Sequence, residues 1–204
     1  MGLIRKQPGP QLSPSSPQVI DPRAALHSPD PEQRRAAVVL LMDAEDAKRL
    51  IAERVTVEEN VVVREALLTA LVGSHDVVAA RTIAQLLRVE DAALRNAVVD
   101  TLGQMPATAE IIEDLLGDQD PDVRQLTVMV LSSLRSPEVP QWLLEVVARD
   151  THANVVGAAL GELAEVGDAT MISAFERVPA RFPGDPFIAF SAATAAQRFR
   201  ENVR

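Results

Sequence analysis

The chain repeats a short pattern about every 30 residues, and this internal repeat restricts its fold more than any other feature of the sequence. In four segments an Asp or Asn is followed four residues later by an Arg, and successive arginines are 30, 31 and 29 residues apart. Two weaker segments have Val156 and Ala189 at the Arg position. Units of this kind stack in a row and share one continuous core. The segments are SPDPEQRRAAVVLL (28–41), EENVVVREALLTAL (58–71), VEDAALRNAVVDTL (89–102), DQDPDVRQLTVMVL (118–131), THANVVGAALGELA (151–164) and GDPFIAFSAATAAQ (184–197).

Each segment has the features of a helix start. The side chain of Asp or Asn accepts hydrogen bonds from the free N–H groups of a first helical turn, and proline is tolerated at the first helical position. Pro31, Pro121 and Pro186 stand at that position. We therefore predict helices that start near residues 31, 61, 92, 121, 153 and 186, each paired with a following helix except the last, and no β-structure. The capping residues are Asp30, Asn60, Asp91 and Asp120.

The repeated arginines form a ladder along the chain. Each lies one helical turn after its cap, where it can pair locally or reach an acid of the neighbouring repeat. Such pairs contribute about a few tenths of a kcal/mol when they are exposed. We interpret the ladder as structural, and direct binding of a partner is the alternative. Its members are Arg34, Arg64, Arg95 and Arg124.

Composition agrees with stacked helices. Apolar residues make up 47% of the chain but aromatic residues only 3%, so Ala, Val, Leu and Ile must form the interior and allow helices to pack closely. We predict an all-α fold, an α-solenoid of about six helical hairpins that occupies residues 21–204. Residues 1–20 are rich in Pro and Ser, hold little apolar material to bury, and are predicted to be a disordered leader.

The D-P-x-V-R-x-x-A pattern resembles the HEAT-like repeats found in phycobilisome lyase subunits and in many bacterial proteins. Such repeats occur in scaffolds, assembly factors, lyase subunits and a few enzymes. The resemblance implies a non-enzymatic adaptor or assembly factor that binds a protein client. The alternative is a subunit of a phycobilin lyase or isomerase, against which stand the absence of Cys and Tyr and the scarcity of rings that could enclose a tetrapyrrole.

Charge and motif content exclude several other functions. Residues 21–204 hold 18 basic against 29 acidic residues, which disfavours nucleic-acid and membrane binding. The absence of cysteine removes disulfides and thiolate sites and favours the cytoplasm. His27, His75 and His152 lie in different repeats, so no metal or cofactor is expected. Acidic pairs such as Glu58/Glu59 and Glu113/Asp114 are interpreted as solvated faces of helices, not as acid–base catalysts.

A protein client is expected on the inner face that the second helices form. The polar positions there are mixed in sign and acidic at the centre. Trp142 lies beside them, either as core filler or as a binding anchor, because Trp is enriched at binding hot spots. The candidate residues besides Trp142 are Arg81, Gln85, Arg88, Glu110, Glu113, Asp114, Gln141, Glu145 and Arg149.

All five phenylalanines lie within the final 30 residues: Phe175, Phe182, Phe187, Phe190 and Phe199. They either close the exposed core face of the last repeat or leave an apolar docking patch for a client or for a second copy of the chain. Phe182, Phe187 and Phe190 are the candidates for such a patch, through which the chain could form a homo-oligomer.

Overall fold

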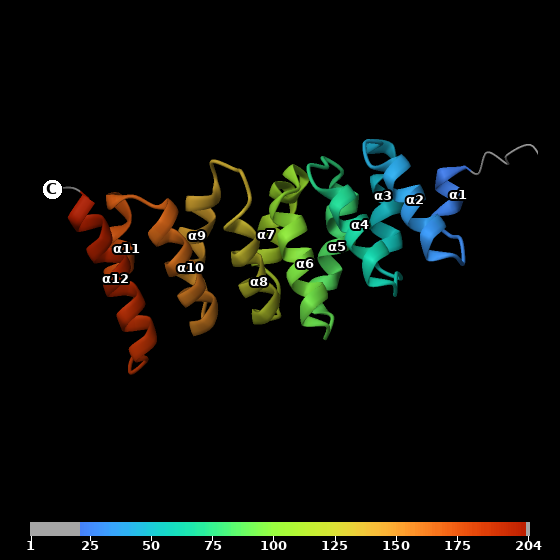
Figure 1. Ribbon diagram of the computed structural model, residues 1–204. Coiled ribbons are helices and arrows are strands. Elements are labelled where there is room, and N and C mark those ends of the chain that lie inside the picture. Colours follow the sequence, from blue (N-terminus) through green and yellow to red (C-terminus); the bar gives the residue numbers. More distant parts are fainter. Residues whose placement is uncertain (1–20, 203–204) are drawn as a thin grey trace, which may run out of the picture.

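Figure 1 shows the computed structural model of the protein, which describes residues 21–202. The predicted leader, residues 1–20, lies outside the described residues. The described part is all helical and contains no strand, which confirms the predicted fold class. The helices lie side by side in one row, with α1 at one end and α12 at the other (Figure 1).

The first helices of the repeats start at the predicted residues. All except α10 begin directly after a residue whose side chain accepts an N–H of the first turn. They are α2 (Pro31–Leu41), α4 (Val61–Leu71), α6 (Ala92–Gly103), α8 (Pro121–Leu131), α10 (Ala153–Val166) and α12 (Pro186–Asn202).

Except for α9, the second helices are shorter than the first, and most are extended by a turn of 3-10 helix. Within the described residues every first helix except α12 is followed by one, as predicted. They are α3 (Lys48–Val55) after η1 (Glu45–Ala47), α5 (Val77–Ala84) with η2 (Gln85–Arg88), η3 (Pro106–Ile111) with α7 (Ile112–Leu116), α9 (Val139–Arg149), and η4 (Ala169–Met171), α11 (Ile172–Arg177) and η5 (Val178–Arg181).

A short helix that we did not predict, α1 (Pro22–Ala25), precedes the first repeat and packs against α2. Its signal is the one used elsewhere in the chain. The Asp21 side chain accepts a hydrogen bond from the N–H of Arg23, and Pro22 occupies the first helical position. Because α1 is only four residues long, no hydrophobic periodicity marks it.

The helices stack with a regular pattern of contacts. From α4 to α12, each first helix packs against both helices of the repeat before it: α4 against α2 and α3, and α12 against α10 and α11. One continuous core of small aliphatic residues runs through the row from Leu26 to Phe199. Each hairpin therefore buries its apolar face only by contact with its neighbours, as expected of a solenoid.

The turn before α2, α4 and α8 is built from two polar side chains. The cap itself accepts N–H bonds of the first turn, for example Asp120 from Asp122 N at 2.9 Å. The residue two positions earlier accepts the N–H of the cap: Asp118 Oδ1 accepts from Asp120 N at 2.9 Å. Ser28, Glu58 and Asp150 do the same for residues 30, 60 and 152. His152 lacks a side-chain cap bond, so the fifth repeat depends on Asp150 for this turn.

Replacing Asp120 with Ala should lower the free energy of unfolding by about 1 kcal/mol, because one N–H of the first turn of α8 loses its acceptor. Asp122→Ala is the matched control. Asp122 lies in the same turn but its side chain caps nothing, so its loss should cost less than about 0.5 kcal/mol. Urea unfolding measures both. Equal losses would show that the cap bond of Asp120 contributes no stability of its own.

Candidate binding groove between the third and fourth repeats

Arg34 of the ladder forms a buried ion pair with Glu58. Its guanidinium donates to both carboxylate oxygens, at 2.7 and 2.8 Å, and to the carbonyl of Ser28 at 2.8 Å. The exposed fractions of the Arg34 and Glu58 side chains are 9% and 0%. Arg54 donates to the same carboxylate at 2.9 Å. Burial opposes ionisation of Glu58, but hydrogen bonds from Arg34, the N–H of Asn60 and Arg54 outweigh it and lower the pKa of Glu58 to about 2.

This pair corrects two expectations. The sequence pattern treats Glu58 and Glu59 alike as solvated residues, but only Glu59 is exposed. Glu58 is buried because it lies two residues before a cap, where its carboxylate meets both the cap N–H and the arginine of the preceding repeat. The energy expected for an exposed pair does not apply to Arg34 either, since a buried pair is costly to break on one side only.

The other ladder arginines differ in the partners that they meet. Arg124 meets Asp150, which stands at the position of Glu58, at 2.7 and 3.1 Å, and also donates to the carbonyl of Asp118 at 2.8 Å. Burial raises the pKa of Asp150, but the bonds from Arg124 and from His152 N–H outweigh it, so the pKa is lowered.

Arg64 and Arg95 do not donate to both oxygens of one carboxylate, as Arg34 and Arg124 do. For Arg64 the equivalent residue is Val89, and the guanidinium lies 3.6 Å from the cap Asp91 instead. Arg95 donates to the carbonyl of Val89 at 2.6 Å and to that of Glu90 at 3.0 Å. All four ladder arginines are thus engaged with groups of this chain, an arrangement that favours the structural interpretation of the ladder.

Several inner-face candidates are also engaged between repeats. Arg81 pairs with Asp114 at 2.8 Å, and Arg88 pairs with Asp118. Arg49, which the sequence reasoning did not single out, pairs with Asp76 at 2.7 Å. These residues connect neighbouring second helices. Gln85 and Glu110 are exposed, and their side chains hold no partner among residues 21–200.

A groove of about 570 Å³ lies where this stacking is interrupted. The second helices α3 and α5 pack directly against each other, whereas α7 and α9 barely touch. The connection between α8 and α9, residues 132–138, is longer than the one between α4 and α5, residues 72–76. The groove residues are Glu113, Leu116, Gly117, Asp118, Arg124, Trp142, Glu145, Val146, Arg149, Asp150 and Thr151.

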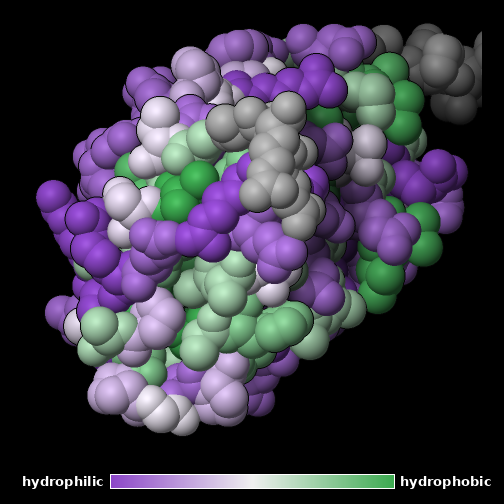
Figure 2. All heavy atoms as spheres, turned by 90° about the vertical axis from the view of Figure 1, so that its left-hand side faces the viewer, coloured by the Kyte–Doolittle hydropathy of each residue, from purple (hydrophilic) through white to green (hydrophobic). Residues whose placement is uncertain are grey.

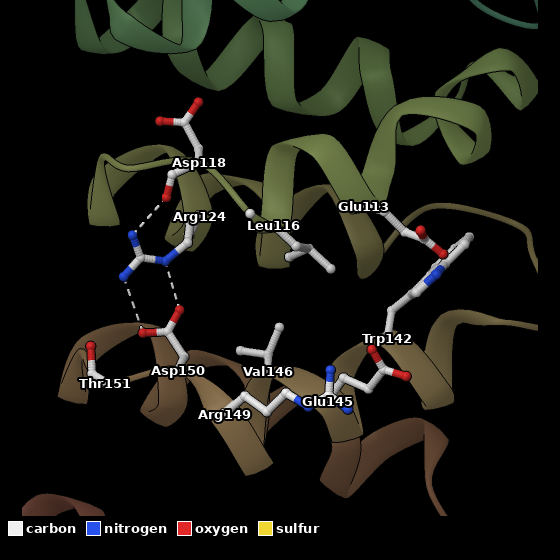
Figure 3. Close-up of a pocket in the computed structure, with 11 residues that line it drawn as sticks. Glu113, Leu116, Asp118, Arg124, Trp142, Glu145, Val146, Arg149, Asp150 and Thr151 are labelled. Carbon is white, nitrogen blue, oxygen red and sulfur yellow. Dashed lines mark hydrogen bonds and ion pairs between the residues drawn. The ribbon is translucent and has the colours of Figure 1, made fainter.

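The groove has an apolar middle and polar ends (Figure 3). Leu116 of α7 and Val146 of α9 point toward each other across it. Trp142 lies beside Glu113 at one end, and the Arg124–Asp150 pair closes the other. Trp142 is only 8% exposed, so its ring belongs to the core while one part of it contributes to the groove wall.

The charges of the groove are partly unpaired. Asp118, Arg124 and Asp150 are held in the ion pairs described above. Glu145 accepts one hydrogen bond, at 3.0 Å from the amide of Gln141. Glu113 and Arg149 are exposed, and neither has a side-chain partner among residues 21–200. The rim therefore offers Glu113, Glu145 and Arg149 to a ligand.

Residues 108–180 match the family model for HEAT repeats. The chain is a HEAT-like repeat protein. The match covers α7, α8 and α9, and thus both walls of the groove, and the hairpins of the described structure continue the same architecture on either side of it. HEAT repeats are generally protein-interaction scaffolds. No curated protein matches the chain in sequence.

Four of the ten inner-face candidates line the groove of this HEAT-like protein: Glu113, Trp142, Glu145 and Arg149. Sequence reasoning missed Leu116, Val146, Asp118 and Asp150. For Asp118 and Asp150 a signal exists, because both precede a cap by two residues. Leu116 and Val146 resemble any other core residue in sequence. Their place in the groove follows from the separation of α7 and α9.

Two other kinds of feature, a metal site and a membrane-spanning helix, are not found among the described residues. Within residues 21–202, no three His, Asp or Glu side chains gather in a way that could hold a metal ion. In the same part of the chain, no helix combines the length and the apolar character needed to cross a membrane.

The phenylalanines near the end of the HEAT-like chain fall into three groups by exposure. Phe175 and Phe199 are buried and stack with ring centroids 5.9 Å apart. Phe182 is half-buried, with the Arg181 guanidinium 5.3 Å from its ring centroid. Phe187 and Phe190 are 58% and 70% exposed. The first group closes the core, and the last two remain on the surface.

Proposed function

We propose that this HEAT-like repeat protein is a non-enzymatic adaptor or assembly factor that binds an extended segment of a protein client in the groove between α7 and α9. The observation that carries the proposal is the combination of an apolar middle with unpaired charges at the rim. The groove volume of about 570 Å³ lies within the usual range for binding pockets and suits a few side chains of an extended chain.

The groove residues define the chemistry of the client. A large apolar side chain would cover Leu116 and Val146 and meet the exposed part of Trp142. A neighbouring Lys or Arg would lie close to Glu113 and Glu145, and a carboxylate one or two residues away would reach Arg149. The half-buried carboxylates Asp118 and Asp150 already pair with arginines of this chain, so they stabilise the repeats and are not available to a client.

Selection of random linear peptides against the purified chain tests the proposal. We expect enrichment of sequences with Lys or Arg next to a large apolar residue. The double variant Glu113→Arg/Glu145→Arg should bind the selected peptides at least about tenfold more weakly, because the client cation then meets like charge. Intrinsic fluorescence reports binding directly, since Trp142 is the single tryptophan of the chain.

The matched control is Glu65→Arg/Asp100→Arg. Both residues are exposed on first helices, α4 and α6, away from the groove, and the net charge changes by the same amount. This variant should bind as the original chain does. Failure to enrich any basic–apolar peptide, or equal loss of binding in both double variants, would contradict the proposal.

A further inference from the structure

The first helix α2 lacks a neighbour that every later first helix has. From α4 to α12, each packs against the first and the second helix of the repeat before it, whereas within residues 21–202 the only helix that packs against the preceding side of α2 is the short α1. Leu40 shows the consequence. The residues at its register position in α4, α6 and α8 are buried, namely Ala70, Thr101 and Val130, whereas Leu40 is 70% exposed.

The exposed side of Leu40 is the side on which a preceding first helix packs. In the third and fourth repeats this contact is direct: a Cβ added to Gly103 of α6 would lie 3.1 Å from the carbonyl oxygen of Val130 in α8. Val130 stands where Leu40 stands in α2. We call the exposed apolar residues around Leu40 the head: Ala36, Val39, Leu40 and Met42.

At the opposite end of the row, no described helix covers the side of α12 that faces away from α10. In α10, Gly157 faces the next first helix, since a Cβ added there would lie 2.6 Å from Cε1 of Phe187. Phe190 occupies the position of Gly157 in α12, and no described helix covers it. We call its exposed surroundings the tail: Ala189, Phe190 and Ala193. Figure 2 looks onto this end and shows apolar residues gathered between hydrophilic ones.

We propose that the tail of one molecule binds the head of a second copy, so that the chain associates head to tail. In the later repeats, each first helix is contacted by the preceding first helix, through the side of that helix that faces the next repeat. We call this the following side of a first helix. On α12 the following side has no described neighbour. The contact would join the uncovered following side of α12 to the uncovered preceding side of α2. It is independent of the groove between α7 and α9.

Charge supports this pairing over contacts between like ends. Residues 172–200 hold four arginines and two carboxylates, whereas residues 21–47 hold six carboxylates and three arginines. Arg177 at the tail end and Asp43 at the head end are exposed and have no side-chain partner among residues 21–200. Arg198 and Arg200 are held in ion pairs with Glu165 and Glu176, so the tail cation without a partner is Arg177, which would attract the acidic head.

The contact is small and open-ended. Only one repeat of each copy takes part in the contact. Gln33 lies at the head, at a position where the later first helices bury Val or another aliphatic residue. We therefore expect the association to be reversible. A head-to-tail contact that does not close into a ring produces linear chains. Their average mass should rise with protein concentration and fall with salt, because the charges involved are exposed.

The test uses two variants that each block one end. Leu40→Asp blocks the head and Phe190→Asp blocks the tail, and both positions are exposed enough to keep the fold, which circular dichroism verifies. In sedimentation velocity, the original chain should exceed twice its 22.0 kDa monomer mass as concentration rises, and each variant alone should stay monomeric. An equimolar mixture of the two variants should form dimers and nothing larger, since one intact head meets one intact tail.

Val62→Asp is the matched control. Val62 is an exposed apolar residue on a first helix, 59% accessible, but it lies inside the row, so this variant should associate like the original chain. The proposal is overturned if the original chain stays monomeric at every concentration, if either blocked variant still associates with itself, or if the mixture stays monomeric.

Discussion

Replacing Glu58 with Ala should lower the free energy of unfolding by about 3–5 kcal/mol, because it leaves the buried guanidinium of Arg34 without its carboxylate. The same change removes the acceptor of the Asn60 N–H and the partner of Arg54. Urea unfolding followed by circular dichroism measures the loss. Glu59→Ala is the matched control, since the neighbouring side chain is exposed, and it should stay within about 0.5 kcal/mol of the original chain.

The pH dependence of stability gives a second view of the same residue. The ordinary pKa of Glu58 is 4.5 and its pKa in the folded chain is about 2, so folding favours the ionised form. The resulting stability, on the order of 3 kcal/mol, is complete above pH 4.5 and is lost as the pH falls toward 2. Glu58→Gln cannot ionise, so its difference from the original chain should shrink over this window. A difference that stays constant from pH 5 to 2 would contradict the account of this pair.

Replacing Phe175 with Ala should also cost about 3–5 kcal/mol, because the ring is fully buried and its removal opens a cavity beside Phe199. Phe190→Ala provides an internal comparison with the same substitution. Phe190 is 70% exposed, so its loss should cost less than about 0.5 kcal/mol. Thermal unfolding of the two variants side by side measures the contrast. Similar losses would mean that the five rings act as one core cluster, which the described geometry excludes.

Local chemistry explains why the helix starts could be predicted from the sequence. A capping side chain, a proline at the first helical position and the spacing of apolar residues all act within one turn, and the six first helices begin where this pattern places them. The short α1 carries the same cap and proline, but four residues are too few to show periodicity. The phenylalanines illustrate the limit: their clustering was visible, but which rings are buried depends on the packing of α12 against α10 and α11.

The candidate site could be predicted only in part, for the same reason. Helical spacing predicts that Glu113, Trp142, Glu145 and Arg149 share one face of the second helices, and all four line the groove. It does not show that Arg81 reaches Asp114 in the next repeat, because that contact depends on how closely two second helices approach. The groove forms where two second helices, α7 and α9, do not approach each other closely. No local pattern in either helix specifies this separation.

Amide hydrogen exchange of the chain with and without a selected basic–apolar peptide tests the proposed binding site most directly. Binding in the groove should slow exchange in α7, in residues 117–120 and in α9, and should leave α2 and α4 unchanged. The Glu113→Arg/Glu145→Arg variant, treated identically, should show no such protection. Protection confined to the first helices, or spread equally over all repeats, would contradict the account.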